Sequence, residues 1–125
     1  GLGRQGGRRR LDAARARAVQ AEAAETQARE GLRLEAMQAE TEVDIAMAQL
    51  QVVRAAVTQA EQNLELVQQR FAQQVGTSTD VLDAQLLLHA TQLLEVRAGY
   101  GVLRAQVRWR RARGLDPVAI EGESP

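Results

Sequence analysis

The feature that most constrains the fold is a run of apolar residues spaced alternately four and three positions apart. Between residues 8 and 74 there is no proline, Gly31 is the only glycine, and strong helix formers dominate. A strict 3.5-residue repeat predicts a left-handed coiled-coil seam along one long helix. The twelve seam residues are Leu32, Ala36, Ala39, Val43, Ala46, Leu50, Val53, Val57, Ala60, Leu64, Val67 and Phe71.

The helical pattern breaks at residues 75–79, which read VGTST, and then resumes. Thr77 and Asp80 have the spacing of a capping box, and Asp80 and Asp83 stand near the positive end of the second helix. A long helix, a short turn and a returning helix predict an all-α antiparallel helical hairpin.

The return helix has its own apolar stripe and a stop signal, Gly114 followed by Pro117. We therefore expect helices over about 8–74 and 79–113. The predicted seam of the return helix is Leu82, Leu86, His89, Leu93, Val96, Tyr100, Leu103 and Val107.

Two members of that seam need an explanation. His89 is interpreted as a polar residue that sets the register, because the sequence has no cysteine and no second histidine to complete a metal site. Tyr100 lies between Gly99 and Gly101 and is expected to pack where small neighbours let helices approach closely.

Charge predicts how the two helices face each other. With the turn centred near Gly76, the arginines of the return helix lie beside an acidic stretch of the first helix. Residues 8–39 are then left without a partner in this chain. The groups involved are Arg104, Arg108, Arg111 and Arg113 on one side and Glu40, Glu42 and Asp44 on the other.

A second, weaker apolar stripe on the first helix points to further neighbours. A helix with two apolar stripes needs a partner on each side, as in a sheet or barrel of helices. The stripe is Ile45, Ala48, Val52, Ala55 and Leu66, interrupted by Gln59.

Composition excludes several functions. A nucleic-acid-binding face would need a net positive charge and a reading element; the formal net charge is zero, and the sequence shows no reading element. No nucleophile is paired with a base and no phosphate loop occurs, so we expect no enzyme, no cofactor and no metal site.

The tip sequence VGTSTDVLDAQ (75–85), preceded by Arg70 and Phe71, resembles the TolC-type outer-membrane efflux proteins. Two further matches are GGRRR at residues 6–10, where that family leaves a membrane β-barrel, and Ala-Arg-Gly at residues 112–114, where its return helix ends. The resemblance covers roughly residues 6–115 and marks the chain as a fragment of a TolC-like α-helical barrel, from the C-terminal repeat.

The resemblance implies transport rather than catalysis. Such proteins are homotrimers whose helices form a periplasmic tunnel continuous with an outer-membrane pore, for drug efflux or type I secretion. Their tips meet a periplasmic adaptor protein that links them to an inner-membrane transporter. The chain would then comprise residues 1–7, a flexible exit from the β-barrel, residues 8–114, the hairpin with its tip at 74–79, and residues 115–125, a C-terminal loop.

Site residues follow from the same resemblance. Asp80 and Asp83 match carboxylates at the tunnel entrance, where they would favour cations. The adaptor-contacting tip would be Val75, Gly76, Thr77, Ser78 and Thr79. The family often has glycine where this chain has Gln74, so Gly76 is expected to take over the turn.

Other interpretations remain open at this stage. Asp80 and Asp83 could be ordinary acids of a helix N-terminus. The whole chain could instead be the hairpin of an adaptor, although the flanks show no β-rich pattern, or a free-standing coiled-coil scaffold or oligomerisation module without a transport role.

Overall fold

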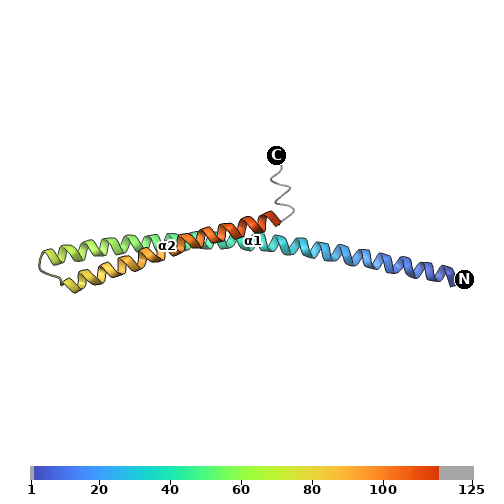
Figure 1. The fold of residues 1–125 in the computed structure, drawn as a ribbon, viewed down its shortest axis with the longest axis horizontal. Helices are drawn as coiled ribbons and strands as arrows, with labels where there is room; N and C mark the ends of the chain where they lie inside the picture. The colour runs from blue at the N-terminus through green and yellow to red at the C-terminus, as the bar shows by residue number, and fades with distance from the viewer. Residues whose placement is uncertain (1, 116–125) are drawn as a thin grey trace, which may run out of the picture. The chain divides into compact units, whose positions relative to one another are not determined.

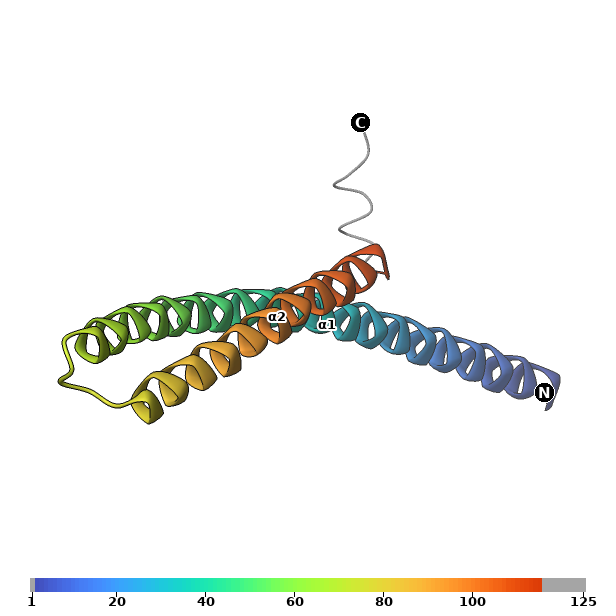
Figure 2. The ribbon, with the colours of Figure 1, turned by 60° about the vertical axis from the view of Figure 1, so that its left-hand side comes forward.

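The computed structural model describes residues 2–115, which form two helices joined by a short turn (Figure 1). Helix α1 spans Leu2–Ala72 and helix α2 spans Ser78–Leu115. Within residues 38–111 the two helices run antiparallel and side by side, as both views show (Figures 1 and 2). The predicted all-α helical hairpin is confirmed.

The helix ends differ somewhat from those expected. Helix α1 begins at Leu2 rather than near residue 8, and it continues through Gly3, Gly6 and Gly7. Each glycine costs about 1 kcal/mol relative to alanine, but extending an existing helix still adds one hydrogen bond per residue. Of the predicted C-terminal loop, Leu115 belongs to α2, and residues 116–125 lie outside the described residues.

The chain divides into two compact units, residues 38–111 and residues 1–37 with 112–125. In the second of these units, the side chains of residues 3–31 are all exposed, and burial begins at Leu32 and Ala36. Exposure over residues 3–31 is what we expect for a segment that has no partner in this chain. The expectation extended to residue 39, and there it is wrong, because Leu32 and Ala36 are half-buried and Ala39 is only 7% exposed.

The predicted seam of α1 is confirmed along almost its whole length. Its members from Leu32 to Val67 are all buried or half-buried, and Val57 and Ala60 are among the most buried residues of the hairpin. Phe71 is the exception at 48% exposed, because α1 ends one residue later and α2 begins only at Ser78.

The predicted seam of α2 is wrong. Every residue of that stripe is exposed, and a different stripe faces α1. Ala84 and Ala105, at 3% and 1% exposed, are its most buried members. This inner seam also alternates steps of three and four, and it consists of Val81, Ala84, Leu88, Thr91, Glu95, Ala98, Val102, Ala105 and Trp109.

Side-chain size explains the exchange. The inner stripe of α2 is rich in small residues, which let it lie close to an α1 seam that is itself made largely of Ala and Val. The bulkier Leu and Val residues of α2 are therefore left on the outside. Thr91, the hydroxyl-bearing member of the inner seam, donates its hydroxyl hydrogen to the carbonyl oxygens of Leu87 and Leu88, at 3.0 and 2.9 Å.

His89 and Tyr100 do not have the roles that the predicted seam of α2 gave them. His89 is exposed, so it does not set the register between α1 and α2. Tyr100 is 60% exposed, and a Cβ built on Gly99 would have no atom within 4 Å, so these glycines do not serve a close helix approach. Both residues lie on the outward side of α2.

The expected charge register is confirmed by one contact between the helices. Arg108 Nε lies 3.3 Å from Glu42 Oε2. Both side chains are largely exposed, so this pair contributes only about 0–1 kcal/mol and reports the register more than it stabilises it.

Candidate functional site

The candidate site is the turn that joins α1 to α2. Helix α1 ends in a Schellman motif, in which the Val75 N–H donates to the Arg70 carbonyl (2.9 Å) and the Gln74 N–H donates to the Phe71 carbonyl (3.0 Å). Gln74 has a φ of 63°, in the left-handed region. That position after a helix is usually glycine.

The expectation that Gly76 takes over the turn is wrong. Within residues 2–115 no glycine has a positive φ, and Gln74 alone among the other residues has one. The Gly76 N–H donates to the Arg70 carbonyl at 3.3 Å. A Cβ at residue 76 would lie 3.5 Å from Arg70 Cβ and 3.6 Å from Asp80 Oδ2, both ordinary contacts. The left-handed conformation therefore falls on Gln74, two residues after the last residue of α1, although residue 74 is not a glycine.

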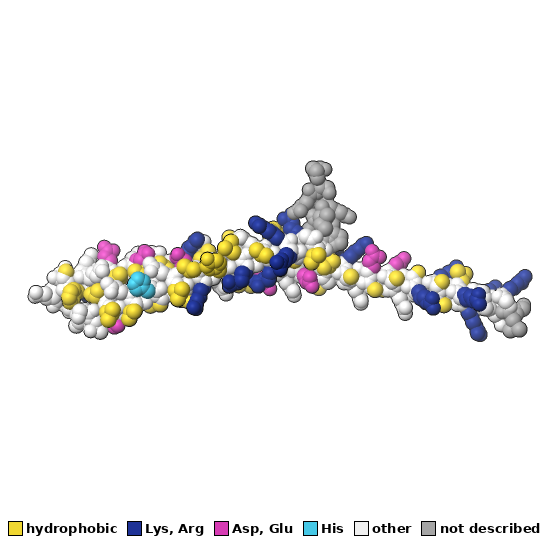
Figure 3. Space-filling model, viewed as in Figure 1, with side chains coloured by type: hydrophobic (Ala, Val, Ile, Leu, Met, Phe, Trp, Pro, Cys, Tyr) yellow, Lys and Arg dark blue, Asp and Glu magenta, His cyan; other side chains and the backbone are white. Residues whose placement is uncertain are grey.

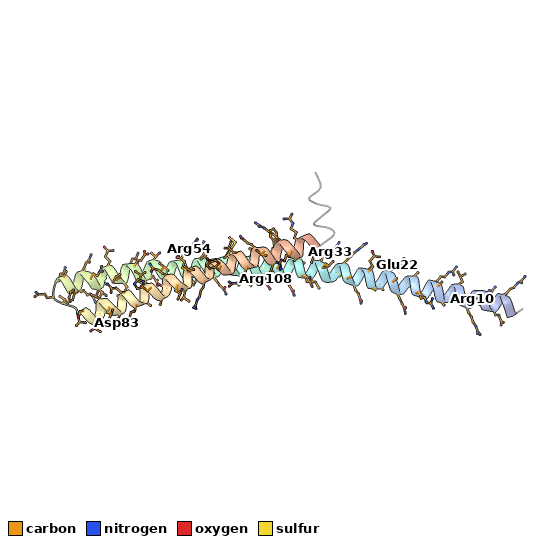
Figure 4. The ribbon with its side chains drawn as sticks, in the orientation of Figure 1. Arg10, Glu22, Arg33, Arg54, Asp83 and Arg108 are labelled. Carbon is orange, nitrogen blue, oxygen red and sulfur yellow. The ribbon has the colours of Figure 1, made fainter. Side chains whose placement is uncertain are left out.

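The predicted capping box is confirmed at the start of α2. The Asp80 N–H donates to Thr77 Oγ1, and the Thr77 N–H donates to Asp80 Oδ2, each at 3.1 Å. Asp80 therefore has a structural role as a helix-capping acid, whatever else it does. Asp83, one turn further along α2, is exposed (Figure 4).

The turn presents its side chains to solvent. Val75 is 75% exposed, which is unusual for an apolar residue, and Thr77, Ser78 and Thr79 are exposed as well. Because hydrogen bonds fix the backbone on both sides of these residues, the exposed surface has a defined shape.

A cleft of about 360 Å³ lies behind the turn, between α1 and α2. Its lining residues include Arg70, Asp80 and Asp83, so two acidic residues and one arginine border the same space. The sequence places Arg70 only in the tip motif, whereas in the structure its carbonyl accepts two of the turn's hydrogen bonds, from the Val75 and Gly76 N–H groups. No residue type signals this role in the sequence, because every residue carries the same backbone carbonyl.

Two observations concern other kinds of site. Residues 2–115 contain no group of three or more His, Cys, Asp or Glu side chains that could hold a metal ion. Neither helix, over the same residues, is long and apolar enough to cross a membrane.

An antiparallel helical hairpin with an exposed, hydrogen-bonded tip is a binding or structural element. The family model for outer membrane efflux proteins matches residues 4–115, which is nearly the whole described chain. The chain therefore belongs to the outer membrane efflux protein family. No curated protein and no solved structure matched it significantly.

Membership fixes the general role. Proteins of this family are outer-membrane efflux channels rather than enzymes. They form trimers and work with adaptor proteins and inner-membrane transporters.

Proposed function

We propose that this chain forms part of the periplasmic tunnel of an outer-membrane channel for drug efflux or type I secretion. The observation that carries the proposal is the family match over residues 4–115, which includes both helices and the turn. The exposed apolar stripes of the hairpin support it, because a helix in a tunnel wall needs neighbours on both sides. In this role the full protein is a homotrimer in the outer membrane, with its helices in the periplasm.

The tip, Val75 to Thr79, docks a periplasmic adaptor protein that connects the channel to an inner-membrane transporter. The exposure of Val75, Thr77 and Ser78 supports this role. So does the Schellman motif next to a capping box, since a turn that is already ordered loses little conformational entropy on binding.

Asp80 and Asp83 line the entrance of the tunnel. Their shared cleft supports this placement, and a ring of such carboxylates in a trimer would favour cations. Asp83 is the better candidate for that role, because Asp80 also holds the helix cap through Oδ2.

Site-specific cross-linking in the periplasm of the native host tests the docking role. The sequence has no cysteine, so Ser78→Cys introduces a unique thiol at the tip, and Thr58→Cys introduces one on an exposed site of α1 away from the tip. A thiol-to-amine cross-linker should join the tip variant, and not the Thr58 variant, to a co-expressed adaptor protein.

Equal cross-linking from both sites, or none from either, would count against adaptor docking at the tip. A chain that carries no adaptor adduct, yet is recovered only as self-associated hairpins away from the outer membrane, would favour the coiled-coil scaffold instead. An intact hairpin is compatible with both adaptor docking and a scaffold role, so the identity of the cross-linked partner distinguishes the two functions.

A further inference from the structure

An apolar groove with a volume of about 520 Å³ lies between α1 and α2, midway along the hairpin. Three large side chains in its lining, Ile45, Val52 and Leu94, remain exposed to solvent. Apart from Gln49, the whole lining consists of Ala, Val, Leu and Ile side chains. Figure 3 shows hydrophobic side chains midway along the hairpin, with arginine side chains further from the turn. The groove can therefore take apolar material, and its own lining offers only one polar side chain.

A second cleft, of about 340 Å³, continues the groove in the direction away from the turn. The two spaces have Ile45 and Gln49 in common in their linings, so they are adjacent. We call the two together the α1–α2 groove. The second cleft adds a charged lining to the apolar one, and its charged members are Glu42, Arg104 and Arg108.

The charged end of the α1–α2 groove carries an uncompensated positive charge. Arg108 Nε lies 3.3 Å from Glu42 Oε2, so these two charges offset each other. Arg104 forms no ion pair with any other residue in the described part of the chain. The groove therefore combines an apolar stretch with one arginine whose charge has no partner in this hairpin.

The Arg104 side chain is turned toward the apolar stretch. A Cβ built on Gly101 would lie 3.8 Å from Arg104 Nη2, so the guanidinium lies back along α2 over a residue that has no side chain. Gly101 is one turn nearer to Leu94 than Arg104 is, and it lines the same cleft. The positive group is thus placed where the apolar lining ends.

The length and the charge of the α1–α2 groove indicate one class of ligand. Leu94 and Arg104 lie about 15 Å apart along the helix axis, which is about the length of a medium straight alkyl chain. A cationic head group would meet Arg104, and a neutral one would leave the guanidinium without a counter-ion. The acidic residues Asp80 and Asp83 border a different cleft, behind the turn.

We propose that the α1–α2 groove binds a single-chain anionic amphiphile of the fatty-acid class. Its alkyl chain lies on Ile45, Val52 and Leu94, and its carboxylate accepts hydrogen bonds from the Arg104 guanidinium. This inference goes beyond the transport role, because it assigns a bound ligand to the side of the hairpin rather than a cargo to the channel or a partner to the tip.

Isothermal titration calorimetry of the full 125-residue chain tests the proposal, with dodecanoate as the probe below the concentration at which it forms micelles. Binding should saturate at one dodecanoate per chain. Shortening the probe to decanoate and octanoate should weaken binding about two- to fourfold for each methylene removed, because less of the chain is taken out of water. Dodecyltrimethylammonium has a similar chain and the opposite charge, and it should bind at least about tenfold more weakly.

Substitutions of arginine separate the charge from the apolar contact. Arg104→Gln should weaken dodecanoate binding about three- to tenfold, the loss expected for one exposed charge-assisted hydrogen bond. Arg110→Gln removes an exposed arginine of α2 that does not line the groove, so this matched control should bind like wild type. Arg104→Glu should reverse the preference, so that dodecyltrimethylammonium binds more tightly than dodecanoate.

Two further variants test the groove itself. Val52→Asn should weaken the binding of dodecanoate and of an uncharged dodecyl glycoside alike, because both chains lie on the same apolar lining. Gly101→Leu fills the space between the apolar stretch and Arg104, and it should weaken dodecanoate binding strongly. Leucine favours a helix more than glycine does, so this loss would report a filled groove rather than an unfolded chain.

Several results would overturn the proposal: binding that does not saturate, equal affinity for the anionic and cationic probes, or equal losses in Arg104→Gln and Arg110→Gln. Binding that disappears as the chain concentration rises would assign the groove to another chain and would also overturn it. Circular dichroism should show the same helix content in every variant, since Val52, Arg104 and Arg110 are exposed. The assay needs no adaptor, so its failure leaves the tunnel proposal standing, and failure of the tip cross-linking leaves this ligand site standing.

Discussion

Replacing Gln74 by glycine should stabilise the hairpin. Gln74 adopts a φ of 63°, and the left-handed conformation costs a residue with a side chain about 1–2 kcal/mol. The Gln74 side chain is exposed, so its removal sacrifices no buried contact. Glycine also makes the unfolded chain more flexible, which takes back about 0.4–1 kcal/mol. The net gain should be about 0.5–1 kcal/mol.

Urea unfolding of the full chain, followed by the helical signal in far-ultraviolet circular dichroism, measures this gain in stability. With a denaturant slope of about 1.5 kcal/mol per molar, the midpoint should rise by roughly 0.3–0.7 M. Gln74→Val is the opposite test, because a β-branched residue is strained at positive φ, and it should lower the midpoint.

Gly76→Ala provides the control that can refute the reasoning. Gly76 has no positive φ, and an added Cβ would make only ordinary contacts, so its replacement should not destabilise the hairpin and should add about 0.4–1 kcal/mol by making the unfolded chain less flexible. A destabilised Gly76→Ala variant beside an unchanged Gln74→Gly variant would place the left-handed residue at 76 and refute the assignment of the turn.

Three further predictions concern the seams, the cap and the entrance. Leu64→Ala, at a half-buried inner-seam site, should cost about 1–3 kcal/mol in urea unfolding, whereas Leu93→Ala measured at concentrations too low for association should cost much less. Thr77→Ala removes the capping box and should cost about 0.5–2 kcal/mol in the same assay; no loss would contradict the observed cap. Asp83→Asn should lower the cation preference of the intact trimer in single-channel recordings, while unchanged selectivity would leave Asp83, like Asp80, an ordinary helix-start acid.

The inner seam of α1 could be predicted from the sequence because one stripe there is clearly longer and more regular than the other. Its second stripe is interrupted at Gln59, so the choice was unambiguous. Helix α2 offers two stripes with the same spacing. One carries the larger side chains, and the sequence pattern favoured it.

Packing against α1 reverses that choice. Two helices approach most closely where their side chains are small, and Ala84, Ala98 and Ala105 meet that condition. The pattern of spacing establishes that a helix has a seam, but the size of the residues across the contact decides which seam it uses. The spacing pattern of α2 alone therefore does not identify its inner seam, because the choice also depends on the residues of α1 that it contacts.

The turn was predictable in its chemistry and not in its geometry. Thr77 and Asp80 signal a helix start by residue type and spacing, and the structure confirms both hydrogen bonds. Glutamine at residue 74 does not itself signal a left-handed conformation, although the resembled family often has glycine at that position, whereas Gly76 is a glycine in this chain. The left-handed position is counted from the end of α1, and a sequence pattern locates helix ends only to within a residue or two.

The distribution of apolar residues links the stability of the hairpin to its assembly. Among the described residues the buried apolar side chains are four alanines and Val57, which bury little area, whereas the larger apolar side chains on the outward side of α2, from Leu82 to Val107, remain about half exposed. Burying a Leu or Val side chain completely contributes about 1.5–3 kcal/mol. Covering the exposed half of each of these side chains by a neighbouring helix would therefore contribute roughly 1 kcal/mol. Seven such side chains outweigh any single contact inside the hairpin, such as the exposed pair of Arg108 and Glu42. The hairpin therefore leaves the larger apolar side chains of α2 available to a neighbouring helix, which is consistent with the proposed place of this chain in a tunnel wall.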